Sequence, residues 1–135
     1  MRRAFVVLAF ALVALAASGC GGPGKAKVKG QLVSGGQPMS FPATQVGVVF
    51  TPVGADGKPD PTKAYTAVVN EDGTFELVAS GGELPSGNYQ VSILATGGKL
   101  ATQMKPYAGA SSPIRRELKP GPNEITIDVT KPDGG

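Results

Sequence analysis

The stretch Tyr89-Gln90-Val91-Ser92-Ile93-Leu94-Ala95 decides the fold of this chain. Tyr89, Val91, Ile93 and Ala95 stand at every second position, with Gln90 and Ser92 between them. That period of two is typical of a β-strand with one buried face, whereas a helix repeats its apolar residues every three to four positions. The stretch therefore predicts a half-buried strand.

The same alternation recurs along most of the chain. It predicts strands at residues 28–32, 46–50, 75–79 and 125–129, and two less regular ones at 64–69 and 114–119. Arg116 interrupts the last of these, which favours an edge strand. No segment after residue 19 sustains a helical spacing. The 20 glycines and 12 prolines lie mostly between these runs. The pattern therefore predicts an all-β domain, a seven-stranded antiparallel β-sandwich.

Two turns join the predicted strands. Residues 70–74 read Asn-Glu-Asp-Gly-Thr, and Gly73 can take the positive φ that closes a tight hairpin. Residues 84–87 read Leu-Pro-Ser-Gly, which predicts a type I turn with Pro85 at its second position and Gly87 at its fourth.

The N-terminus has the three parts of a bacterial secretory signal: a basic start with Arg2 and Arg3, an apolar block at residues 4–17, and small residues before Cys20. The end of this run resembles the lipobox of bacterial lipoproteins. The resemblance implies cleavage between Gly19 and Cys20 and acylation of the new N-terminal cysteine. As a helix the apolar block is about 21 Å long, against a hydrocarbon core of about 30 Å, so attachment to a membrane depends on lipid. The alternative is ordinary cleavage near Ala16 or Ala17, which leaves Cys20 as a free secreted thiol.

Processing divides the chain into four parts: a signal peptide at 1–19, a lipidated flexible linker at 20–24, a β-sandwich domain at 25–131 and a C-terminal tail at 132–135. The signal carries two of the 13 basic residues and none of the 10 acidic ones, so the net charge falls from +3 to +1. A nucleic-acid-binding domain needs a clustered basic face, which this charge balance argues against. We therefore expect no nucleic-acid partner. The signal and the lipidated cysteine in turn predict a location in the cell envelope.

The side chains argue against most catalytic chemistry. The chain contains no histidine and one cysteine, which excludes histidine-based triads and sites built from imidazole or several thiolates. Asn70, Asp72 and Gly73 fit part of a calcium loop, but Val68 and Ala79 fall where its strongest ligands belong, so a hairpin explains them better. We expect no catalytic residue, no metal and no cofactor. The carboxylates are scattered, so a hydrolase of unrecognised type stays open.

Two loops, at residues 51–63 and 97–113, are longer than simple connections require. The second contains Leu100, Met104 and Tyr107. These side chains either fold back over one open end of the core, which we favour, or expose Tyr107 beside Tyr65 or Tyr89 as a stacking surface. In the second arrangement Tyr107 is the candidate ligand contact.

Several short motifs then occur in a recognisable order along residues 25–131. They are Val28 with Gly30, the turn at 35–38, Phe50-Thr51-Pro52, the hairpin at 72–75, the stretch at 84–91, Lys105-Pro106-Tyr107 and Ser112-Pro113-Ile114. In this order the chain resembles small bacterial lipoproteins with a carboxypeptidase-regulatory-like, or transthyretin-like, β-sandwich domain. The resemblance implies a sandwich of this immunoglobulin-like type and an accessory, non-catalytic role.

These observations lead to a functional expectation. The sequence indicates a membrane-anchored envelope lipoprotein whose domain binds or supports a neighbouring protein or polysaccharide without catalysing a reaction. The alternative is a carbohydrate-binding module that uses loop aromatics, and the absence of tryptophan and the presence of only three tyrosines would keep that aromatic row short.

Overall fold

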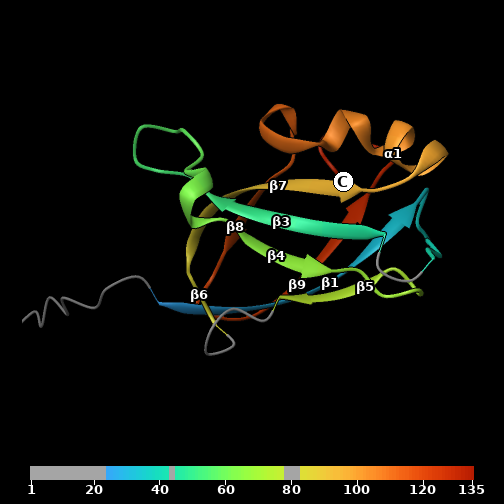
Figure 1. Cartoon of the computed structure of the whole chain (residues 1–135). Coiled ribbons are helices and arrows are strands. Elements are labelled where there is room, and N and C mark those ends of the chain that lie inside the picture. Colours follow the sequence, from blue (N-terminus) through green and yellow to red (C-terminus); the bar gives the residue numbers. More distant parts are fainter. Residues whose placement is uncertain (1–23, 43–44, 78–82) are drawn as a thin grey trace, which may run out of the picture.

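The structure, a computed structural model, describes residues 24–42, 45–77 and 83–135. Cys20, the predicted cleavage site after Gly19 and most of the linker lie outside these residues. The described part forms two packed β-sheets (Figure 1). It contains seven strands of four or more residues and two of two residues. The predicted all-β sandwich is confirmed.

The first sheet, sheet A, is built around the long strand β1 (Lys25–Ser34). It pairs antiparallel with β2 (Gln37–Pro38), β5 (Thr74–Leu77) and β6 (Leu84–Pro85). It pairs parallel with β9 (Gly121–Asp128), so the expectation of a wholly antiparallel sandwich is wrong for this pair. The chain reaches β9 from the other sheet and not through a hairpin that follows β1. A hairpin would require antiparallel pairing, whereas this connection permits the parallel arrangement.

The second sheet, sheet B, has the strand order β4-β3-β7-β8. Its members are β4 (Tyr65–Val68), β3 (Val46–Pro52), β7 (Gly87–Ala95) and β8 (Arg115–Leu118). All of its pairs are antiparallel. Each predicted run of alternating residues corresponds to one of the seven longer strands, and the predicted edge strand, β8, lies at the edge of sheet B. The part of the 75–79 run after Leu77 lies outside the described residues.

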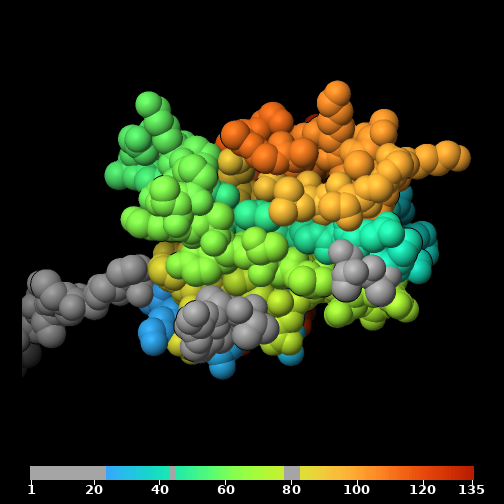
Figure 2. Space-filling model, viewed as in Figure 1, coloured from blue at the N-terminus to red at the C-terminus, as the bar shows by residue number. Residues whose placement is uncertain are grey.

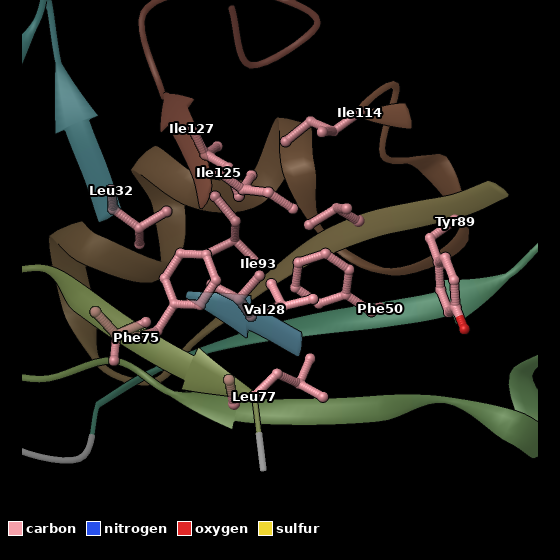
Figure 3. Packing of buried hydrophobic residues seen from close by; sticks show 14 of the residues in the cluster. Val28, Leu32, Phe50, Phe75, Leu77, Tyr89, Ile93, Ile114, Ile125 and Ile127 are labelled. Carbon is pink, nitrogen blue, oxygen red and sulfur yellow. The ribbon is translucent and has the colours of Figure 1, made fainter. Parts of the chain in front are cut away.

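The apolar faces of the two sheets meet in one core (Figure 3). Phe50 of β3 lies near its centre, with its ring centroid 6.3 Å from that of Phe75 and 6.3 Å from that of Tyr89. Gly30 of β1 makes room for Phe75, since a Cβ at this position would stand 2.3 Å from the tip of that ring. Burial of this apolar surface is the main stabilising contribution expected of such a core.

The predicted type I turn at residues 84–87 is wrong. Pro85 and Leu84 pair with Lys25 and Ala26 of β1 in sheet A, and Gly87 begins β7 in sheet B. The segment crosses from one sheet to the other instead of reversing its direction. The hydroxyl of Tyr89 donates to the carbonyl oxygen of Pro85 at 2.7 Å and fixes this corner, much as the tyrosine corner does in immunoglobulin sandwiches. Gly87 keeps a structural role, because its φ is +144°.

The connection between β7 and β8 contains helical turns that the sequence did not predict. They are α1 (Gly98–Met104) and the 3₁₀ turns η2 (Lys105–Tyr107) and η3 (Gly109–Ser111). A further 3₁₀ turn, η1 (Pro61–Lys63), precedes β4. α1 has no side-chain cap, and Met104 is its one fully buried residue, so its sequence shows no repeating apolar face.

The C-terminal residues pack against the domain. The guanidinium group of Arg116 donates to the backbone oxygens of Asp133, Gly134 and Gly135 at 3.0–3.2 Å. Gly134 is buried and its carbonyl accepts from the amide of Asp128 at 2.8 Å. The segment expected to be a tail is thus hydrogen-bonded to β8 and to the end of β9.

Candidate functional site

Tyr107, the candidate ligand contact, lies inside the molecule. Its side chain is 6% exposed, and its hydroxyl donates to the carbonyl oxygens of Val129 at 2.7 Å and Lys131 at 2.9 Å. Met104 is 1% exposed, and Leu100 packs against the same core. The interpretation that these residues fold back over the core is therefore confirmed, and the ring of Tyr107 offers no open face to a ligand.

The same connection is fixed to sheet B by a buried amide. Gln90 of β7 is 3% exposed, and its Nε2 donates to the carbonyl oxygens of Ala110 at 3.0 Å and Ser112 at 2.8 Å. The hydroxyl of Ser112 in turn donates to the carbonyl oxygen of Val91 at 2.5 Å. These bonds hold η3 beside β7, where β8 does not extend, and so cover an otherwise open sheet edge.

A hollow of about 490 Å³ runs over the outer face of sheet B, and we call it the sheet B trough. It lies between the loop at residues 53–63 and η3, which appear in Figure 2 as the green and orange prominences on one side of the molecule. Its lining residues are Val49, Thr51, Pro59, Pro61, Ala64, Thr66, Gln90, Ser92, Leu94, Gly109, Ala110 and Arg115.

Strand register arranges the floor of the trough in rows. Val49 of β3 stands between Thr66 of β4 and Ser92 of β7. Two residues along, Thr51 pairs with Gln90, which pairs with Arg115 of β8. In the other direction Leu94 of β7, which is 50% exposed, forms the end of the trough. Its neighbour in register, Gly47, and the 61% exposed Val68 beside Gly47 lie beyond the lining residues. The trough thus has an apolar end, a hydroxyl-rich middle and a cationic end.

The outer face of sheet A differs in chemistry. Two smaller hollows of about 250 and 350 Å³ there share Lys29 and Glu124. Lys29 forms an ion pair with Glu76 at 3.8 Å, and Lys25 forms one with Glu83 at 3.5 Å. Exposed pairs of this kind contribute little to stability, and they neutralise the face. This mixed-charge surface is typical of a solvated sheet face.

The other predicted positions have structural roles. Gly73 has a φ of +82° and closes the 70–74 hairpin, as predicted. The Asp72 carboxylate accepts from the amide and hydroxyl of Thr74, which lowers its pKa, and the Asn70 amide also donates to Thr74. The hairpin interpretation therefore accounts for both polar residues.

No group of three or more Asp, Glu, His or Cys side chains in the described ranges is close enough to hold a metal ion. Among those same residues, no helix has the length and apolar character needed to cross a membrane.

Comparison with known proteins supports the fold. No protein-family model matches the chain, and no curated protein matches its sequence. Among solved structures, a DUF3823 family protein from Parabacteroides merdae is similar, with a TM-score of 0.50 and 21% identity. The match covers 76% of this chain and 44% of that one, so this chain spans less than half of that protein. At this identity the similarity concerns the β-sandwich architecture alone.

Sequence reasoning missed the sheet B trough. Gln90 and Ser92 were expected on the polar face of their strand, and that face does carry the site. The trough is formed where the two long loops stand on either side of this face. The alternation of residues along a strand does not predict where loops lie.

Proposed function

We propose that this protein is an envelope lipoprotein, anchored through lipid on Cys20, whose β-sandwich is a non-catalytic module that presents the sheet B trough to an envelope partner. The observation that carries the binding role is the trough itself, a walled hollow on a rigid sheet. Its buried Gln90 is held by two hydrogen bonds, so this part of the surface is organised before any partner arrives.

The anchor is supported by the sequence around Cys20 and by its distance from the domain. Lys25, the first residue of β1, follows Cys20 by five residues. A chain of that length reaches at most about 18 Å when fully extended. The anchor would therefore keep the sandwich close to the membrane surface, where an envelope protein or polysaccharide is the nearest partner.

The accessory role is supported by the resemblance to carboxypeptidase-regulatory-like lipoprotein domains. Their fold agrees with the two-sheet architecture seen here, and the similar DUF3823 structure has the same general architecture. Fold similarity alone does not establish a function, so the proposal depends on the trough and on the anchor.

The anchor is tested by fractionation of the native host. We expect wild-type protein in the membrane fraction, released by detergent and not by high salt. Cys20→Ser removes the acylated sulfur and should leave the protein soluble or unprocessed, whereas Ser18→Ala keeps a small residue before the cysteine and should remain in the membrane. Membrane retention, equal to that of wild type, of Cys20→Ser protein from which the signal has been cleaved would contradict the anchor.

The binding role is tested by site-specific photo-crosslinking in intact envelopes. A photoreactive residue replaces Thr66, which is exposed in the trough, or Glu76, which is exposed on the outer face of sheet A. We expect a discrete cross-linked product from position 66 and none from position 76. Products from position 76 alone, or from neither position, would reject the trough as the binding surface.

A further inference from the structure

The polar side chains of the trough keep unused hydrogen-bonding capacity. Within the described residues, the hydroxyls of Thr51, Thr66 and Ser92 make no hydrogen bond, and Oε1 of Gln90 accepts none. No fully buried side-chain nitrogen or oxygen of that part of the chain lacks a partner, so these free oxygens reach solvent. A ligand in the trough meets three hydroxyls and one fixed amide oxygen.

Arg115 is the one charged residue among those that line the trough. Its Nη1 donates to the carbonyl oxygens of Ser112 at 2.9 Å and Ile114 at 3.1 Å, which orients the guanidinium group. No carboxylate lines the trough to neutralise it. An oriented guanidinium group without a neighbouring acid favours an anionic group on the ligand, such as a carboxylate.

The floor of the trough discriminates between classes of ligand. It is the face of a sheet, so the backbone groups of β3 and β7 are already paired with one another. An extended peptide that adds to a sheet needs a free edge, and laid across this face it would leave its own amides without backbone partners. A ligand rich in hydroxyls instead matches the free side-chain oxygens of the floor.

We propose that the sheet B trough binds a short acidic oligosaccharide, with a sugar carboxylate on Arg115 and sugar hydroxyls on Thr51, Ser92 and Gln90. This inference rests on the proposed function, because it assigns a ligand class to the same trough. Pro59 and Pro61 of the wall and Leu94 of the floor contact the C–H faces of the sugar rings. From Gln90 to Leu94 the floor extends about 14 Å, at roughly 3.4 Å per strand residue.

The test uses the full lipidated protein in detergent micelles. Binding of tetragalacturonic acid is measured by calorimetry and by amide chemical shifts, with its methyl ester and an acidic hexapeptide as comparison ligands. We expect the acid to bind and to shift the amides of residues 49–51, 66 and 90–94. The ester, which lacks the charge, should bind about tenfold more weakly or worse.

Substitutions of Arg115 test whether its positive charge recognises the sugar carboxylate. Arg115→Gln should weaken binding of the acid at least about tenfold and abolish the preference over the ester, whereas Arg115→Lys should retain part of that preference. Lys99→Gln removes the same charge from α1, outside the trough, and should bind as wild type does. Equal melting temperatures show that the variants fold.

Several results would overturn the inference: no binding of the acid, equal binding of acid and ester, tighter binding of the hexapeptide, or shifts confined to residues 27–31 of sheet A. Cross-links from position 66 together with no binding of the acid would reject the ligand class and leave the proposed function standing. Absence of both would reject the two together.

Discussion

Gly73 shows how a single residue fixes the β4–β5 hairpin. Its φ of +82° is strained for any residue with a side chain, and a Cβ there would stand 2.5 Å from the carbonyl oxygen of Met39. Gly57 has a similar φ of +77°, but a Cβ there would meet open space. Comparing substitutions at the two positions therefore separates the cost of backbone strain, which both share, from the cost of a steric clash, which only Gly73 has.

We expect Gly73→Ala to destabilise the domain clearly more than Gly57→Ala. The shared strain of the left-handed conformation costs about 1–2 kcal/mol. Gly73→Ala also forces the segment at Met39 to move, and Gly73→Val should be at least as damaging. The free energy of unfolding in urea measures the difference. Equal losses for the two alanine variants would mean that the close approach of Met39 does not restrict this turn.

Asp128 makes the stability of the domain sensitive to acid. Its carboxylate accepts from the hydroxyl and amide of Thr130 and from the amide of Gly35, which lowers its pKa from 3.8 to about 2. The folded state thus favours the charged form, so this stabilisation is present above the ordinary pKa and is lost as the pH falls from about 4 to about 2.

Asp128→Asn should therefore flatten the decline of the melting temperature between about pH 4 and about pH 2, because the amide does not titrate there. Thr130→Val removes the hydroxyl donor and keeps the backbone one, so it should give an intermediate slope. Thermal unfolding followed at several pH values measures both. A slope unchanged in Asp128→Asn would assign the acid sensitivity to other carboxylates.

Among the elements, the segment from α1 to η3 closes the core beside β7. Met104 and Tyr107 bring apolar surface from this segment into the core. Met104→Ala should cost about 2–5 kcal/mol and speed hydrogen exchange of the β7 amides at residues 91–95. Leu100→Ala, in the same helix but half-buried, should cost less. Equal losses for the two variants would mean that α1 lies on the surface and does not form part of the core.

The strands were predictable because their period of two is a local property. The apolar residues of β3 and β7 alternate in the sequence, and in β3 buried and half-buried positions alternate as well. In β7 the alternation sets only the direction of the side chains, because residues 89–93 are all buried, with Gln90 and Ser92 covered on the outer face. The crossover at residues 84–87 was not predictable, because Pro and Gly there suit either a turn or a passage between sheets. Its partner, β1, is some 60 residues earlier in the chain, and that pairing decides the outcome.

For the whole molecule, the site depends on relations that no local pattern contains. Thr51, Thr66, Ser92 and Arg115 come from four different strands, and they meet because of strand order and register in sheet B. Tyr107, the candidate from the sequence, instead became part of the core, because burying an aromatic ring with its hydroxyl satisfied by two carbonyls is favourable. The sequence therefore indicated the type of domain, whereas the position of the sheet B trough became clear only from the tertiary structure.

The proposed anchor would set where the trough meets its partners. A sandwich anchored as proposed, within about 18 Å of a membrane, would sample envelope partners at high local concentration, which would compensate for weak intrinsic affinity. The same domain released into the medium would lose that advantage. The proposed function therefore depends first of all on lipid attached to Cys20.

The most direct test of that claim is intact-mass analysis of the protein purified from its native host, with sequencing of its N-terminal peptide. We expect a chain that begins at Cys20 and carries a diacylglycerol and an amide-linked acyl chain. A chain that begins near Ala17 or Ser18, carries an unmodified thiol at Cys20 and is recovered from the medium would contradict it.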